Sequence, residues 1–159
     1  TKLAQYDNLI VIRTLSKAFG LAGCRVGYGV AQKEVIDALG LTKLVYNMNI
    51  LSQNAALAAM DYADDILAHN IPPTLAARQH FMDALKDVPN LTVYPSATNF
   101  VLVRVPDGPA MVKALHDADI CVRSYKAADL KNCLRITITT DDVVRRVVAV
   151  MTEEAKKYA

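Results

Sequence analysis

The 159-residue sequence has no tryptophan, and only 6% of its residues are aromatic. Its 18 basic and 16 acidic residues leave a formal net charge of +2. Without a basic run interleaved with aromatic residues, nucleic acid is not an expected partner. No apolar stretch approaches the ~20 residues that span a bilayer, and the chain does not open on a signal-peptide pattern. We therefore expect no membrane association.

Cysteine is also scarce, and its pattern indicates the redox state of the compartment and whether the chain binds a metal ion. Cys24, Cys121 and Cys133 are odd in number and lack the spacing of metal ligands. The three histidines are scattered along the chain and form no ligand pattern either. We expect free thiols in a reducing cytoplasm and no metal site. Aliphatic side chains are abundant, since 53% of the residues are hydrophobic, and they suffice for a globular core.

Apolar periodicity predicts an α/β chain. The predicted strands cover 8–12, 25–31, 91–95, 99–105, 120–125 and 133–139, and the predicted helices cover 32–44, 49–68, 75–88, 109–118 and 141–158. The run NLIVI (8–12) is rich in β-branched residues, which is typical of a strand buried on both faces. Asn49 is a candidate helix cap. Pro72 and Pro73 should break the helical pattern and separate residues 1–71 from an α+β unit at residues 72–159.

One lysine, Lys17, stands in the largely small and apolar segment RTLSKAFGLAGCRVG (13–27). An ammonium kept away from water tends to lose its proton, and the neutral amine attacks carbonyl groups. Alone, a loop lysine would be solvated and GLAG would be an ordinary turn. Here Thr14 and Ser16 supply hydroxyls, and Arg25 supplies a guanidinium that can bind phosphate bidentately. A phosphate site beside an amine predicts pyridoxal 5′-phosphate (PLP), an aldehyde cofactor that carries a phosphate.

The same segment resembles the PLP-lysine signature of the fold-type I aminotransferases. The leading threonine of TLSKAFGLAG and the glycine six residues after the lysine resemble the subgroup that contains histidinol-phosphate aminotransferase. Further along, YNMN, YPSATNFVLVRV, VRSY and CLRITIT occur in the order and at the spacing of that family's downstream motifs. The resemblance therefore covers nearly the whole chain.

Carried over by position, the resemblance makes Lys17 the catalytic Schiff-base lysine. It makes Thr14, Ser16 and Arg25 ligands of the PLP phosphate, together with Lys17 in the cofactor site. It also implies that residues 1–71 are the end of a large α/β/α PLP-binding domain and that residues 72–159 are a C-terminal α+β small domain.

The resemblance places the substrate site in the second half of the chain. Arg135 in CLRITIT matches the family's substrate-anion arginine, and Arg123 in VRSY resembles a second arginine beside it. Their spacing suits neighbouring strands, although Arg123 could equally be a strand-edge arginine that faces water. Charged side chains are rare in apolar strands, so the charge of Arg135 in the otherwise apolar CLRITIT indicates a binding role. Asn99 lies in a stretch that relatives place near the substrate entrance, and it could also be an ordinary turn residue.

The resemblance implies a cytoplasmic homodimer that exchanges an amino group between histidinol phosphate and 2-oxoglutarate in histidine biosynthesis. The family's carboxylate at the pyridine nitrogen and its stacking aromatic lie upstream of the lysine strand. We therefore expect a C-terminal fragment that is inactive alone. Open alternatives are an aromatic or aspartate aminotransferase, a phosphothreonine decarboxylase, or a non-catalytic folded α+β remnant.

Overall fold

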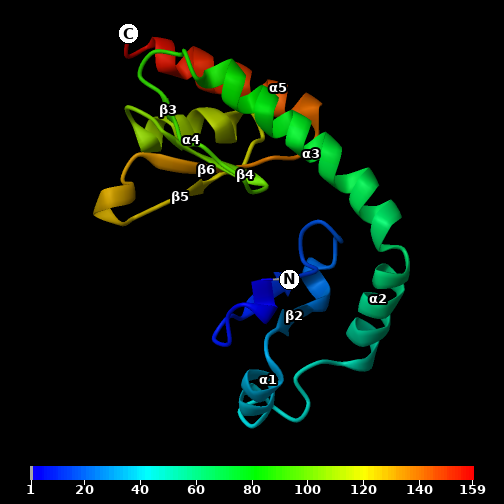
Figure 1. Ribbon diagram of the computed structural model, residues 1–159. Coiled ribbons are helices and arrows are strands. Elements are labelled where there is room, and N and C mark those ends of the chain that lie inside the picture. Colours follow the sequence, from blue (N-terminus) through cyan, green and yellow to red (C-terminus); the bar gives the residue numbers. More distant parts are fainter. Residues whose placement is uncertain (1) are drawn as a thin grey trace. The chain divides into compact units, whose positions relative to one another are not determined.

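The computed structural model describes residues 2–159, which form two compact units that adjoin in sequence at Asn70 and Ile71. Figure 1 shows the helices and strands of both units. One helix, α3 (Ala63–Leu85), begins in the first unit and ends in the second. The assignment of residues 1–71 to a large domain and of residues 72–159 to a small domain stays a prediction. Within the described part, no helix is long and apolar enough to cross a membrane.

The first unit contains a two-stranded antiparallel sheet and short helices. Its elements are η1 (Lys2–Ala4), β1 (Val11–Thr14), η2 (Ala22–Cys24), β2 (Gly27–Val30), α1 (Lys33–Gly40) and α2 (Ile50–Asp61). β1 pairs with β2 in a register that brings Thr14 opposite Gly27. The predicted cap of α2 is confirmed, because the Asn49 side chain accepts a hydrogen bond from the Ser52 amide over 2.9 Å.

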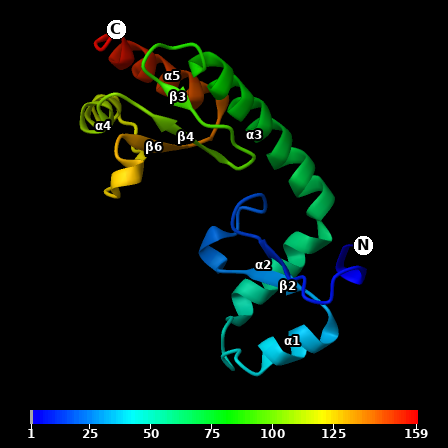
Figure 2. The same ribbon diagram turned by 60° about the vertical axis from the view of Figure 1, so that its left-hand side comes forward.

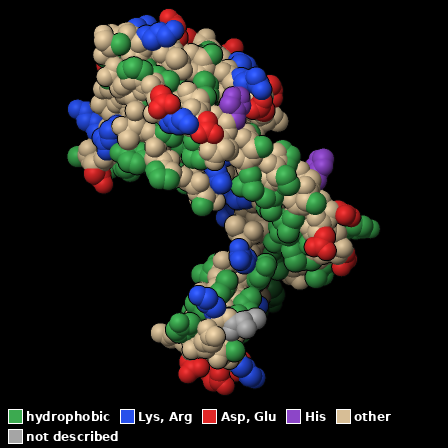
Figure 3. All heavy atoms as spheres, turned by 45° about the horizontal axis from the view of Figure 1, so that its top comes forward, with side chains coloured by type: hydrophobic (Ala, Val, Ile, Leu, Met, Phe, Trp, Pro, Cys, Tyr) green, Lys and Arg blue, Asp and Glu red, His purple; other side chains and the backbone are tan. Residues whose placement is uncertain are grey.

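The prediction of a first strand buried on both faces is wrong for the described residues. Ile12 in β1 is 79% exposed, and all four residues of β2 are exposed. Leu15 and Val26 are the only buried apolar residues between positions 2 and 70. A two-stranded sheet is covered only where further strands or helices pack on it. Large apolar side chains therefore lie on the surface (Figure 3), among them Leu41, Leu44, Val45, Tyr46, Leu51 and Leu57.

The second unit is a four-stranded antiparallel sheet with helices on one face, as Figure 2 shows. The elements after α3 are β3 (Thr92–Val93), β4 (Phe100–Arg104), α4 (Gly108–Asp117), β5 (Arg123–Ser124), η3 (Ala128–Leu130), β6 (Cys133–Thr137) and α5 (Asp141–Lys156). The strand order is β3-β4-β6-β5, so β5 lies at an edge. Val101, Val103, Leu134 and Ile136 alternate along the two central strands and pack into one core. This arrangement agrees with the predicted α+β unit.

The predicted break at Pro72 and Pro73 is wrong, because α3 continues through both prolines. A proline inside a helix removes one backbone hydrogen bond and crowds the preceding turn, at a cost of about 3 kcal/mol. The helix beyond the prolines is held by Ala77, Phe81 and Leu85, which are buried in the core. Tertiary packing of that stripe offsets the local cost. The boundary between the helices lies earlier, where α2 ends before α3 begins at Ala63.

We expect limited proteolysis of the 159-residue chain to leave a resistant C-terminal fragment. The hydrophobic core is formed by side chains from α3, β4, α4, β6 and α5. Every buried residue of this core follows residue 71 in the sequence. Cleavage follows local opening, which is easiest where few apolar contacts are buried. Early cuts should therefore fall within residues 2–70, and mass spectrometry should find a persistent fragment that begins near residue 71. Early cuts within residues 91–139, with residues 2–70 protected, would contradict this expectation.

Candidate active site

The loop that carries Lys17 connects the end of β1 to η2. The Leu15 amide donates to the Val26 carbonyl over 3.1 Å, which extends the β1–β2 pairing beyond the strands. The loop closes through hydrogen bonds from the Leu21 amide to the Leu15 carbonyl (3.0 Å) and from the Gly20 amide to the Lys17 carbonyl (2.9 Å). Gly20 has a φ of 70°, a left-handed conformation that glycine adopts without strain. Lys17 thus lies in a compact turn anchored by the buried Leu15 and Val26.

Two hydroxyls and a guanidinium flank this turn. Thr14 Oγ1 donates to Ser16 Oγ over 2.9 Å, and the Ser16 amide donates to Thr14 Oγ1 over 3.1 Å. The hydrogen bond between Leu15 and Val26 brings the next residue on each side, Ser16 and Arg25, to the same end of the turn. Thr14, Ser16, Lys17 and Arg25, the four residues predicted to bind one cofactor, thus lie along one turn, and their joint binding of a cofactor stays a prediction. Hydroxyls, a guanidinium and an amine are a donor set that fits a phosphate beside an aldehyde.

The side chain of Lys17 is exposed, although its surroundings in the sequence suggested shelter from water. The small and apolar residues after it form the turn itself and do not cover the amine. Keeping the amine neutral by desolvation requires a low-dielectric environment. Such shelter for Lys17 would have to come from a bound group or from other protein segments, because residues 2–70 do not supply it.

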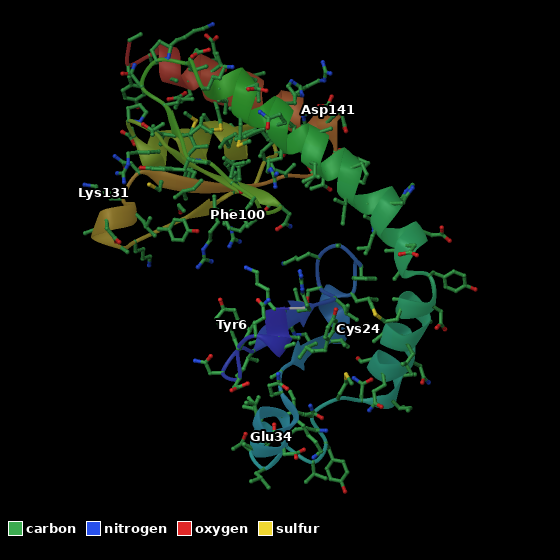
Figure 4. All side chains as sticks on the ribbon, in the orientation of Figure 1. Tyr6, Cys24, Glu34, Phe100, Lys131 and Asp141 are labelled. Carbon is green, nitrogen blue, oxygen red and sulfur yellow. The ribbon has the colours of Figure 1, made fainter. Side chains whose placement is uncertain are left out.

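Arg25 has a conformation that the sequence did not reveal. Its φ of 58° and ψ of 41° lie in the left-handed helical region, which costs a residue with a side chain roughly 1–2 kcal/mol. Its Nη1 donates to the Ala22 carbonyl over 3.0 Å, which helps to hold the guanidinium beside the turn. Backbone strain of this kind persists at functional sites, where the side chain has to occupy one position. The geometry therefore favours a binding role for Arg25. Cys24, labelled in Figure 4, marks this segment.

Arg123 and Arg135 form a direct cross-strand pair in the second unit. β5 and β6 are antiparallel, and Arg123 is the register partner of Arg135. The prediction that the two arginines lie on neighbouring strands is confirmed, and paired residues project from the same face of a sheet. Like charges directly opposite each other destabilise a sheet unless an anion lies between them. The pair is therefore a candidate anion site.

Arg135 is the better sheltered member of this pair. Its side chain is half-buried, and its Cζ lies 5.2 Å from the centre of the ring of Phe100, a cation–π contact on the sheet. Phe100 is labelled in Figure 4. Its Nε is buried and has no hydrogen-bond partner among residues 2–159. A buried donor without an acceptor is costly. Because this Nε is shielded, an anion would accept hydrogen bonds from the terminal nitrogen atoms of Arg135; the Arg123 side chain is exposed.

Asn99 immediately precedes β4. It is half-buried, and its carbonyl accepts a hydrogen bond from the Ile138 amide over 2.9 Å at the end of β6. This backbone bond explains its place at the start of a strand. Its predicted contact with substrate stays a prediction.

Metal-binding side chains are not clustered in the described chain. No group of three or more His, Cys, Asp or Glu residues between positions 2 and 159 is arranged to hold an ion. The cysteines are free: Cys133 is buried, Cys24 is half-buried and Cys121 is exposed.

Comparison with known proteins identifies the family. The model of the family "Aminotransferase class I and II" matches residues 1–151. The histidinol-phosphate aminotransferase of Thermoanaerobacter sp. is 43% identical over 137 residues, which are 86% of this chain and 38% of that protein. The chain thus spans less than half the length of the curated relatives that it matches.

Solved structures agree with this comparison. Histidinol-phosphate aminotransferase from Sinorhizobium meliloti, in complex with pyridoxal-5′-phosphate, is 30% identical with a TM-score of 0.71, covering 96% of this chain and 42% of that chain. A decarboxylase from Sulfurospirillum multivorans is 26% identical with a TM-score of 0.81, covering 97% of this chain and 46% of that chain. These matches confirm the predicted fold class. The chain belongs to the aminotransferase class I and II family.

Proposed function

We propose that the full-length protein is a PLP-dependent aminotransferase that exchanges an amino group between histidinol phosphate and 2-oxoglutarate, a step of histidine biosynthesis. The observation that carries the choice of substrate is the direct pairing of Arg123 with Arg135. Two guanidiniums on one face match the charge of a phosphate dianion better than that of a single carboxylate. Relatives named histidinol-phosphate aminotransferase, at 36–43% identity, support the same choice.

The residues of the lysine turn would hold the cofactor. The hydroxyls of Thr14 and Ser16 and the guanidinium of Arg25 would bind its phosphate. Bound PLP supplies an aldehyde that condenses with amines and a ring that withdraws electrons from the substrate. Lys17 Nζ, in its neutral form, would be the nucleophile toward that aldehyde and the base that takes the proton from Cα of the amino donor.

The substrate residues orient the amino donor. Arg135, sheltered beside Phe100, would bind the phosphate of histidinol phosphate bidentately, and Arg123 would supply the second guanidinium. Asn99 would line the approach to that site. The binding site for one anion would then serve both histidinol phosphate and the 2-oxo acid in turn.

The proposal includes a cytoplasmic homodimer. Free cysteines suit a reducing compartment. The exposed apolar side chains of the first unit, such as Leu41, Val45 and Tyr46, suit burial against other protein segments. Sedimentation of the full-length protein would measure the oligomeric state.

The proposed activity is tested with the full-length protein, including whatever sequence precedes Thr1. Histidinol phosphate and 2-oxoglutarate, supplied with PLP, should yield glutamate. Phosphothreonine, tested in parallel, should release no carbon dioxide. Release of carbon dioxide from phosphothreonine without glutamate formation would instead identify a decarboxylase and overturn the proposal.

Substitutions at Arg25 should separate stability from cofactor binding. Arg25→Gly relieves the left-handed strain and should stabilise the protein by up to about 1 kcal/mol, whereas Arg25→Ala keeps the strain. Both variants lose a charge-assisted phosphate contact and should bind PLP about 10-fold or more weakly. Titration with PLP, followed by absorbance, and chemical denaturation measure the two effects. An unchanged PLP affinity in both variants would remove the phosphate role of Arg25.

A further inference from the structure

The edge strand that carries Arg123 is too short to hold its own register. β5 contains only Arg123 and Ser124, and it pairs with β6 alone. Two residues contribute few ladder hydrogen bonds, and the repulsion between Arg123 and Arg135 opposes the pairing. The position of Arg123 must therefore depend on how the connection between β5 and β6, residues 125–132, is held.

A third arginine holds that connection. Arg104, the last residue of β4, donates from Nη1 to the Lys131 carbonyl over 3.3 Å and from Nη2 to the Asp129 carbonyl over 3.1 Å. Its Nε donates to the hydroxyl of Tyr94 over 3.1 Å. The hydrogen bond with the Tyr94 hydroxyl raises the pKa of Arg104 above its ordinary value. The guanidinium thus spans from the segment after β3 to the β5–β6 connection, whose Lys131 is labelled in Figure 4.

The contacts of Arg104 differ in kind from those of Arg135. Arg104 is the register partner of Cys133, two residues before Arg135 on β6, so both arginines project from the same face of the sheet. All three nitrogen atoms of the Arg104 guanidinium group donate to protein oxygen atoms, whereas Nε of Arg135 has no partner within residues 2–159. Arg104 is therefore held by three hydrogen bonds to the protein, whereas Nε of Arg135 makes none within the described residues.

The other end of the connection has a separate anchor. Asn132 has a φ of 62°, and its Nδ2 donates to the Pro106 carbonyl over 3.0 Å. Its Oδ1 accepts from the Gly108 amide over 3.1 Å, and its carbonyl accepts from the Val105 amide over 2.9 Å. These bonds hold the beginning of β6 without help from Arg104. Loss of Arg104 should therefore release η3 and β5 while β6, with Arg135, stays in place.

We propose that Arg104 is a positioning residue of the substrate-anion site. Its hydrogen bonds to the Asp129 and Lys131 carbonyls keep Arg123 opposite Arg135. The kinetic part of this inference rests on the proposed function. The structural part, the fixing of β5 by Arg104, does not depend on it.

The test compares Arg104→Met with Arg146→Met in the full-length protein. Arg146 is a matched control, because it also donates from Nη2 to a backbone carbonyl of this unit, that of Ala118, over 2.9 Å. Arg104→Met should speed amide hydrogen exchange in residues 123–131 by about 10-fold or more, with no change in residues 100–103 or 133–137. Arg146→Met should leave exchange in residues 123–131 unchanged. Equal exchange in wild type and Arg104→Met would overturn the proposal.

Kinetics supply the second readout. Arg104→Met should raise KM for histidinol phosphate by about 10-fold with little change in kcat, the lower end of the loss expected when one charged hydrogen-bonding partner is removed, because Arg123 is displaced and not deleted. In an Arg123→Ala background the same substitution should add nothing, because both changes remove the same contact. Additive effects would overturn the positioning role.

Two further results distinguish failure of the Arg104 proposal from failure of the proposed substrate role of Arg123 and from misfolding of the variant. If Arg123→Ala alone leaves KM unchanged, the proposed substrate role of Arg123 fails, and the exchange measurement still decides whether Arg104 fixes β5. If Arg104→Met does not fold, Arg104→Lys replaces it, since one ammonium cannot span both carbonyls and the Tyr94 hydroxyl. Arg104→Lys should show the same selective exchange in residues 123–131, and wild-type exchange there would count against the proposal.

Discussion

Replacing Lys17 by alanine should lower kcat for amino transfer from histidinol phosphate by about 100- to 10,000-fold, the range that loss of a positioned proton-transfer group costs. The nucleophile toward the cofactor is lost in the same change. Lys17→Arg should be as slow as Lys17→Ala, because a guanidinium keeps its charge and can neither attack a carbonyl nor take a proton. Single-turnover kinetics with the full-length protein would measure these rates.

Lys43 offers a matched control for this prediction. It is an exposed lysine of the same unit, and Lys43→Ala should leave kcat unchanged. Added methylamine should restore part of the activity of Lys17→Ala, because a small free amine can replace the missing base. A Lys17→Ala protein that retains the wild-type kcat would show that another group moves the proton.

Replacing Arg135 should produce the second large effect, on kcat/KM for the anionic amino donor. A charge-assisted bidentate contact contributes about 1.5–3 kcal/mol, or roughly 10- to 150-fold. Arg135→Ala removes both the contact and the cation over the Phe100 ring. Arg135→Lys keeps the charge but loses the planar fork, so it should also lose most of kcat/KM.

An amine without an anionic group separates binding from folding in this experiment. Its reaction with the Arg135 variants should change little, because it makes no use of the guanidinium. Equal losses with both amines would mean that Arg135 stabilises the β4–β6 sheet and does not bind substrate.

Features that depend on local chemistry are predictable from the sequence of this chain. The sequence predicts Asn49 as a helix cap, and its side chain accepts a hydrogen bond from the Ser52 amide. Arg123 and Arg135 were predicted on neighbouring strands, and the register pairs them directly. In both cases the information lies within a few residues or in the spacing across one short connection.

Features that depend on tertiary context could not be predicted. Pro72 and Pro73 indicate a helix end, yet burial of Ala77, Phe81 and Leu85 keeps α3 continuous. The apolar run 8–12 indicates a covered strand, but cover depends on partners that residues 2–70 do not provide.

Local sequence patterns also do not predict backbone conformation or long-range contacts in this chain. The left-handed φ of Arg25 has no signal in the sequence, since glycine or asparagine is the usual occupant. The hydrogen bonds from Arg104 to Asp129 and Lys131 span 25 and 27 residues of the chain, so only the fold reveals them.

Reduction of the full-length protein with borohydride in the presence of PLP, followed by peptide mapping, tests the central claim most directly. If Lys17 Nζ is the group that binds the cofactor aldehyde, the pyridoxyl label should be found on Lys17 with a stoichiometry near one per chain, and Lys17→Ala should take up none. A label on another lysine, such as Lys43, with Lys17 unmodified would contradict the account.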